Sequence, residues 1–269
     1  VLTLNRKFID RKIAATWQLL LENGWAQLDS FEPIVASMSF YVFIGSWKML
    51  DFFGAYYLKR FKLYPEFDPV QEEGGAFQFF SPLGTKDRPG FLALFAYLLP
   101  LIVFDLLFPR RSSRSYFHLP PPTFLGLLCQ LALSLFVYDG LFYFAHLAMH
   151  RDPSIYQKIH YKHHKATRLC SVEVVRHSFT DGSLQVLANI VTLNVLGLSA
   201  CTRAVHNIVV TYLLTETHSG YDMPWMLHNI LPRGVLGGSP AHEAHHRYGS
   251  GNFHQFFTYF DKLFGFEIS

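Results

Sequence analysis

The stretch HLAMHRDPSIYQKIHYKHH, residues 146–164, decides the fold of this chain, because a long apolar run ends in it and five histidines occur within its nineteen positions. His146 and His150 are four residues apart at the end of that run. Side chains four residues apart on an α-helix point the same way. The spacing therefore predicts a helix that presents two imidazoles side by side at its carboxyl end.

Asp152 and Pro153 follow directly. Aspartate is a good N-cap, and proline is favoured at the first position of a helix. We therefore expect one helix to end here and a second to begin at Pro153. Three histidines at helical spacing are expected to share one face of that second helix: His160, His163 and His164.

A further group of histidines lies in SPAHEAHH, residues 239–246, at His242, His245 and His246. A single zinc ion needs only three or four ligands, and neutral imidazole also suits iron, copper and nickel. The three histidine clusters hold eight imidazoles in all, so together they predict a site large enough for two metal ions.

The remaining histidines carry weaker signals. His218 stands in TETHSGYDMPW, where Gly220 can end a helix. We expect it to be a ninth ligand, with a helix C-cap as the alternative. His177 and His228 are candidates for supporting the site. We interpret the others as structural residues: His118, His206 and His254.

The composition places this site at a membrane. Of the 269 residues, 50% are hydrophobic and only 16% are charged. Because the apolar residues come in long blocks, we predict an all-α, polytopic membrane protein with about four transmembrane helices. The histidine-rich part is expected to form a helical metal domain in the cytosol. A net charge of +3 with scattered basic residues argues against nucleic-acid binding. Since the first residue is Val, we expect the natural chain to begin earlier.

The predicted organisation has two parts. Residues 1–30 form an amphipathic lead-in helix, on the bilayer or on the rest of the protein. Residues 31–269 form one membrane domain with these features: spans near 34–58, 91–108 and 124–150, a hairpin at 184–216 that enters the bilayer and returns, and a metal-site core at 146–164 and 218–246. The hairpin returns to the side that it left, so all histidine clusters are expected to share one compartment.

Asp139 lies two helical turns before His146. A carboxylate within a span is costly unless it has a partner. We expect it to accept a hydrogen bond from the outer nitrogen of a metal-bound imidazole. A hydrogen bond to a neighbouring helix is the alternative.

The order HxxxH, HxxHH, membrane hairpin, HxxHH resembles the fatty acid hydroxylase superfamily, the membrane di-iron oxygenases of the endoplasmic reticulum. HSGYDMPW at 218–225 and the AHEAHH, GNF and DKLFG elements at 241–265 resemble its sterol branch. RFKLYPEF at 60–67 and the YFDKLFG ending are similar to the cholesterol 25-hydroxylase type. The C-4 methylsterol oxidase type carries a Tyr-Ala-His-Pro-like element. Here VVRHSFTD matches it only through His177.

The resemblance implies a metal-ligand set of nine histidines: His146, His150, His160, His163, His164, His218, His242, His245 and His246. It further implies two iron ions and hydroxylation of a sterol or other lipid C–H bond by O2. Electrons would come from NAD(P)H through a membrane carrier such as cytochrome b5. The implied location is the endoplasmic reticulum membrane, and the basic residues around 151–168 favour a metal site that faces the cytosol.

Two other classes of function compete with this interpretation. Residues 242–246 match the HExxH pattern of zinc metalloproteases, in which Glu243 would be the general base. That interpretation leaves the five histidines at 146–164 without a role. A non-catalytic metal or haem carrier would place its polar residues across several spans. Here the histidines instead gather at helix ends.

Overall fold

The computed structural model describes residues 2–72, 103, 106–107, 119–166 and 168–268. Within these ranges the regular elements are helices, and two isolated β-bridges join loop segments. The longer helices are α1 (Leu2–Glu22), α2 (Phe31–Phe53), α7 (Phe124–Arg151), α9 (Phe179–Val195), α10 (Ala200–Thr217) and α12 (Gly238–Tyr248). The short ones are η1 (Trp25–Gln27), α3 (Ala55–Leu58), η2 (Lys59–Phe61), α4 (Pro69–Glu72), α8 (Pro153–Ile155), η4 (Tyr156–His160), η5 (His163–Lys165), η6 (Ser171–Val175), α11 (Leu227–Ile230) and α13 (Tyr259–Phe264).

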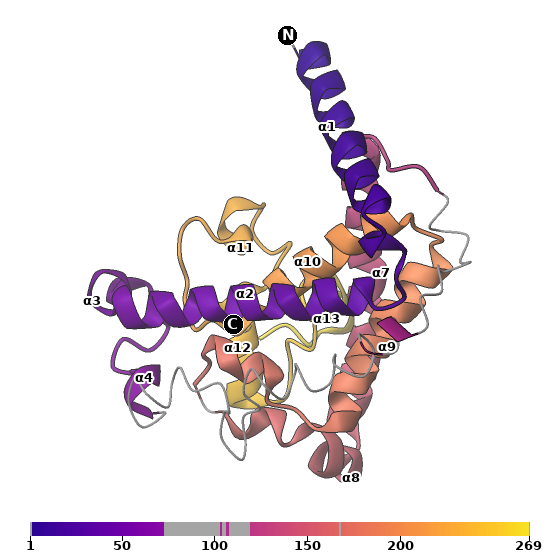
Figure 1. Ribbon diagram of the computed structural model, residues 1–269. Coiled ribbons are helices and arrows are strands. Elements are labelled where there is room, and N and C mark those ends of the chain that lie inside the picture. The colour runs from indigo at the N-terminus through magenta and orange to yellow at the C-terminus, as the bar shows by residue number, and fades with distance from the viewer. Residues whose placement is uncertain (1, 73–102, 104–105, 108–118, 167, 269) are drawn as a thin grey trace.

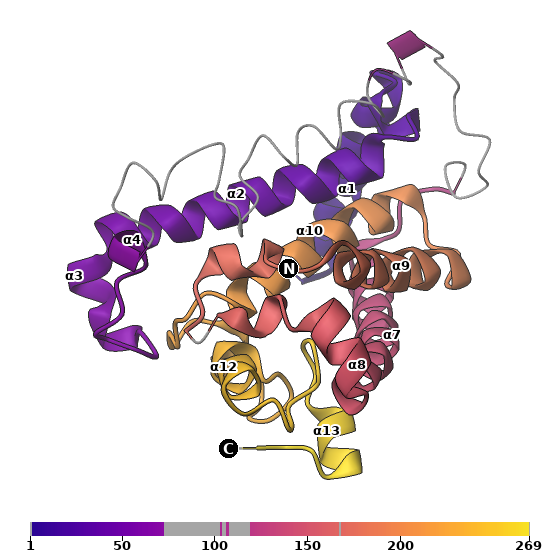
Figure 2. The ribbon, with the colours of Figure 1, turned by 90° about the horizontal axis from the view of Figure 1, so that it is seen from below.

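Helix α10 lies at the centre of the bundle. Helix α2 runs along one side of it, and α7 packs against both α10 and α9. Figure 2 shows α12, α13 and α8 on the side of α10 that faces away from α2. In Figure 1 the indigo helix α1 points away from the body of the protein. The bundle thus separates a long apolar helix on one side from the histidine-bearing segments on the other.

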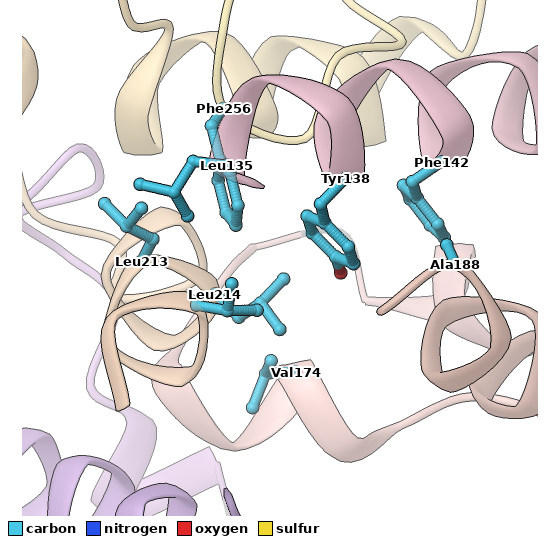
Figure 3. Close-up of a cluster of buried hydrophobic side chains, with 9 residues drawn as sticks. Leu135, Tyr138, Phe142, Val174, Ala188, Leu213, Leu214 and Phe256 are labelled. Carbon is cyan, nitrogen blue, oxygen red and sulfur yellow. The ribbon is translucent and has the colours of Figure 1, made fainter. Parts of the chain in front are cut away.

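The main hydrophobic core joins α7, α10 and the C-terminal tail (Figure 3). Tyr138 of α7 and Phe256 of the tail are almost completely buried in it, with ring centroids 5.8 Å apart. The other buried members are Leu135, Phe142, Val174, Ala188, Val210, Leu213 and Leu214. This packing holds the tail against the helix that carries the first two histidines.

Two helices in the described part of the chain, α2 and α7, are long and apolar enough to cross a membrane. Both expose large apolar side chains, such as Val42 on α2 and Phe136 on α7. They correspond to the predicted spans 34–58 and 124–150, except that the first ends earlier, at Phe53. The span predicted at 91–108 lies outside the described residues apart from 103, 106 and 107, as does His118.

The predicted hairpin is formed by α9 and α10. Much of α10 is buried in protein, including the polar residues Arg203 and Asn207. Arg203 donates to both carboxylate oxygens of Glu32 at the start of α2, and Nη2 lies 2.9 Å from Oε2. An ion pair of this kind ties the returning helix to α2. Insertion of the hairpin into the bilayer stays a prediction.

The segment after α2 fastens the end of this helix to the metal-site core. Asp51 is 3% exposed, lies 3.2 Å from Lys62 Nζ and accepts a 2.8 Å hydrogen bond from the Tyr221 hydroxyl. Lys62 and Tyr221 also form one of the isolated β-bridges. The RFKLYPEF stretch therefore connects the end of α2 to the loop that follows His218.

Candidate metal centre

The nine predicted ligand histidines converge into two adjacent groups. The five-histidine group contains His146, His150, His160, His164 and His245. The four-histidine group contains His163, His218, His242 and His246. Within each group the nearest ring nitrogens all lie within 4.8 Å of one another. The two groups are in contact, because the ring of His164 in the first stacks on the ring of His246 in the second with centroids 4.5 Å apart.

Each HxxHH motif contributes to both groups, which differs from the single shared face that the spacing predicted. His160 and His164 belong to the five-histidine group, whereas His163 belongs to the other. On a helix, residues i+3 and i+4 both neighbour residue i but lie on opposite sides of it, so the two can face different groups. The later motif divides by the same spacing but with the groups exchanged. His242 and His246 belong to the four-histidine group, and His245 belongs to the five-histidine group.

The first motif does not lie in a regular α-helix. Asp152 is the N-cap of α8, and its carboxylate accepts from the backbone N–H of Ser154, as its sequence position predicted. The chain then continues as a π-helical turn at Tyr156–His160 and a 3-10 turn at His163–Lys165, so the predicted second α-helix is short. π-turns are rare and concentrate at functional sites.

Backbone carbonyls fix the orientation of several imidazoles. His146 Nδ1 donates to Phe253 O at 2.7 Å, and His245 Nδ1 donates to Gly251 O at 2.8 Å. In the other group, His218 Nδ1 donates to Leu214 O at 2.7 Å and His163 Nδ1 donates to Arg176 O at 3.2 Å. Because a carbonyl only accepts, Nδ1 carries the proton in each neutral ring, and Nε2 is left with a lone pair.

These inner lone pairs face one another. His163 Nε2 lies 3.4 Å from His218 Nε2, and neither atom carries a hydrogen in the neutral ring. Burial lowers the pKa of His218 to about 4 and that of His245 to about 3. Protonation near neutral pH therefore does not relieve the repulsion. Converging neutral imidazoles with outward Nδ1 hydrogens are the donor set that a transition-metal cation requires, so these residues fit two such ions.

The GNF turn at 251–253 supplies two of the carbonyls. Asn252 has a positive φ of 51°, a conformation that asparagine tolerates better than most residues. Its side chain accepts from the backbone N–H of Ile268 and donates to Ala241 O. This left-handed residue lets the carbonyls on either side of it point at histidines from two distant helices.

Asp181 is a supporting residue that the sequence analysis did not identify. Its Oδ2 lies 2.8 Å from His160 Nδ1, and the side chain is buried. Burial raises the pKa of Asp181 to about 7, and a cation on the far side of the imidazole would favour the carboxylate form. Ser178 caps α9 and accepts from the Asp181 backbone N–H, which sets the position of this acid. The only sequence signal was a Ser with an acid three residues later, the pattern of a helix start.

We expect Asp181→Asn to weaken metal retention in the five-histidine group by about 10- to 100-fold, the usual cost of losing a carboxylate that orients a ligating imidazole. Metal content measured after dialysis against graded concentrations of chelator checks this. Asp222→Asn, at a carboxylate outside both groups, is the control, and Asp181→Glu should restore part of the retention. Equal chelator sensitivity in Asp181→Asn and wild type would reduce Asp181 to a packing role.

Asp139 occupies a different place from the one predicted. It does not reach an imidazole of either group; its Oδ1 accepts from the backbone N–H of Phe256 at 2.6 Å. It also accepts from Phe257 N–H at 3.4 Å. The correct interpretation is that this buried carboxylate holds the C-terminal tail against α7. The tail in turn supplies Phe253 O to His146, so Asp139 acts on the site through the backbone.

The other histidines lie outside the two groups. His177 Nδ1 donates to Ser178 O, and its ring borders the cavity described below. His228 Nε2 lies 3.0 Å from Asp222 Oδ1, so its predicted support of the metal site is not seen among the described contacts. His206 and His254 have the structural roles expected of them, with Ser134 and Asp261 as partners. His218 is both a helix C-cap and a group member.

Glu243 is not placed as a metalloprotease base. Its Oε2 accepts from the backbone N–H of Leu169 at 3.0 Å, and the carboxylate does not line the cavity beside the histidines. This hydrogen bond links α12 to the segment after the first HxxHH motif. Residues 242–246 therefore match HExxH only because the HxxHH motif has a glutamate as its second residue.

A cavity opens beside both groups. Its walls include Phe142 and Val174, which are apolar, and Gln185 and Gln255, which are polar. The remaining lining residues are His146, His160, His163, His177, Asp181, His218 and His242. Because its lining includes members of the five-histidine group and of the four-histidine group, the cavity borders both.

A family model described as fatty acid hydroxylase matches residues 131–266. The chain belongs to the fatty acid hydroxylase family. The matched range contains all nine histidines, and the resemblance drawn from the motifs is confirmed. Fatty acid hydroxylases are membrane proteins, and the two helices that are long and apolar enough to span a bilayer agree with this.

Its similarity to individual fatty acid hydroxylases points to the sterol branch. Cholesterol 25-hydroxylase of Homo sapiens is 29% identical over 272 residues, which cover 94% of this chain and 92% of that protein. A methylsterol monooxygenase of Aspergillus fumigatus is 34% identical over 179 residues, 64% of this chain and 57% of that protein. A cholesterol 25-hydroxylase-like protein of Danio rerio is 32% identical over 145 residues, 54% of this chain and 57% of that protein. No solved structure matches the chain.

Proposed function

We propose that this protein is a membrane di-iron monooxygenase that hydroxylates a C–H bond of a sterol, as its relative cholesterol 25-hydroxylase does by name. The observation that carries the proposal is the pair of adjacent all-histidine groups beside one cavity. In the overall reaction one atom of O2 enters the C–H bond, the other leaves as water, and two electrons and two protons are consumed. Two bound irons would supply the activation of O2.

The chain's own residues position and shield the reaction. His146, His163, His218 and His245 would bind metal through Nε2, each oriented by a backbone carbonyl. Phe142 and Val174 give the cavity an apolar wall that suits a hydrocarbon segment and excludes water. The exposed apolar surfaces of α2 and α7 would lie in lipid, from which a sterol can enter.

The proposal extends to location and electron supply. We infer that the protein resides in the endoplasmic reticulum membrane with the metal site facing the cytosol. Exposed basic residues beside the histidines, such as Lys158 on the π-turn and Lys165 on the 3-10 turn, support a cytosolic face and contact with an acidic electron carrier. NAD(P)H would be the electron source, and a cytochrome b5 type of protein the carrier.

The second candidate is the same chemistry at a methyl group on carbon 4 of the sterol ring. The similarity to the Aspergillus methylsterol monooxygenase favours it. The two candidates differ only in the part of the sterol that reaches the cavity, so product analysis separates them.

The decisive experiment combines metal and product analysis. Protein purified in detergent should contain close to two irons per chain, one for each histidine group. With a reductase, an electron carrier, NADPH and O2, it should convert cholesterol to a side-chain alcohol identified by mass spectrometry. Oxidation of a 4-methylsterol instead would move the assignment to the second candidate. One zinc per chain and no sterol oxidation would overturn both.

A further inference from the structure

The cavity beside the metal centre contains a buried polar group that the hydroxylase proposal leaves unused. Gln255 is 5% exposed, lines the cavity, and its Nε2 has no hydrogen-bond partner in the described protein. Of the lining residues outside the two histidine groups, it alone is among the described side chains that have a buried atom without a partner. Buried amides are nearly always hydrogen-bonded, so an unpartnered one that lines a cavity marks a place where a water molecule or a ligand atom can bind.

The backbone holds Gln255 rigidly. On one side, Phe253 N–H donates to Asp261 Oδ1 at 2.9 Å. On the other, Phe256 N–H donates to Asp139 Oδ1 at 2.6 Å. The same short segment presents Phe253 O to His146. The backbone that carries Gln255 is therefore fixed relative to the five-histidine group, which limits the positions that its side-chain amide can take.

The chemistry of the cavity restricts what Gln255 can bind. A sterol side chain is hydrocarbon and offers no hydrogen-bond acceptor before it reacts. After hydroxylation, the same carbon carries an oxygen that lies beside the histidine groups, where the reaction placed it. The apolar walls at Phe142 and Val174 give that oxygen no partner, so a partner must come from the polar lining. Among the polar lining residues outside the histidine groups, Gln255 is the one whose buried donor has no partner among the described residues.

We propose that Gln255 donates a hydrogen bond from Nε2 to the hydroxyl group formed on the sterol, so that the cavity distinguishes the oxidised carbon from its hydrocarbon precursor. This inference rests on the proposed function. It makes Gln255 a product-contacting residue, whose loss leaves the histidine groups intact. One hydrogen bond of this kind changes an affinity by about tenfold.

The test measures binding without turnover. Iron-loaded protein in detergent is kept under nitrogen and without reductant, and is titrated separately with cholesterol and with 25-hydroxycholesterol. We expect the wild type to bind the alcohol about tenfold more tightly than cholesterol. Gln255→Met, which keeps the length and removes both amide atoms, should reduce this preference to near one while iron content and cholesterol affinity stay unchanged.

Two further variants guard against misfolding and general effects. Gln255→Asn keeps the amide but withdraws it by one methylene, and should also lose most of the preference. Gln157→Met, on the exposed surface of the π-turn, makes the same chemical change outside the cavity and should keep the preference.

The outcomes separate this inference from the proposed function. Equal wild-type affinity for the two sterols, or an unchanged preference in Gln255→Met with full iron content, would refute the role of Gln255 and leave sterol hydroxylation standing. Failure of the wild type to bind either sterol would refute both proposals.

Discussion

Replacing His163 or His245 by alanine should abolish sterol hydroxylation and lower the metal content from two ions per chain to about one. Each substitution removes a ligand from a different group, since His163 belongs to the four-histidine group and His245 to the five-histidine group. We expect activity to fall by more than about 100-fold, the upper end of what a lost supporting hydrogen bond costs at a metal site. Metal analysis and product formation are measured on the same preparations.

The controls use side chains that resemble the ligands in type or position. His228→Gln changes a buried imidazole outside both groups and should retain metal and activity. Glu243→Gln tests the protease alternative and should keep most hydroxylase activity, because this carboxylate is engaged by Leu169. Loss of activity in Glu243→Gln together with full activity in His163→Ala would contradict the oxygenase proposal.

Removing the metal should strongly destabilise the folded protein. Without cations, bare Nε2 atoms such as those of His163 and His218 face one another in a buried site. Metal binding to a preformed imidazole site contributes directly to folding free energy. If the two ions together stabilise the fold by about 5 kcal/mol, their removal lowers Tm by about 10 to 20 °C.

Thermal unfolding in detergent, followed by tryptophan fluorescence with and without chelator, measures this effect. Adding ferrous iron back under nitrogen should restore Tm. His163→Ala, which keeps one complete group, should show a smaller shift on chelation. If chelation leaves Tm unchanged, the metal does not stabilise the fold, and packing alone holds the converging imidazoles in place.

Eight of the nine converging histidines could be predicted from sequence because imidazoles at helical spacing leave a regular pattern, whereas His218 stands alone and was singled out by its place just before Gly220. The N-cap at Asp152 and the long helix through residue 150 were predictable for the same reason. The division of each HxxHH motif between two groups could not be predicted. Both motifs divide in the same way, with i and i+4 in one group and i+3 in the other, although the first lies in π- and 3-10 turns and the second in the α-helix α12. Helical spacing tells which imidazoles are neighbours along one segment, but not which imidazoles of a distant segment each of them meets.

The supporting contacts were less predictable than the histidines. Asp181 meets His160 across 21 positions of sequence, and nothing in its local pattern distinguishes it from an ordinary acid in the first turn of a helix. Asp139 was predicted to need a buried partner, which is correct, but the partner is backbone from the tail. Pairings between distant segments depend on the packing of α7 against the tail, and single-sequence patterns do not contain that information.

The shared use of both HxxHH motifs has a consequence for how the protein is made. One motif alone provides at most three imidazoles and splits them two and one between the metal positions. The five-histidine group already has four imidazoles before residue 242, whereas the four-histidine group has only His163 and His218 until His242 and His246 have been synthesised and have folded back. The two metal positions are therefore completed at different times: a chain that ends before residue 242 should still offer four imidazoles at one position and only two at the other, and should hold one ion at most.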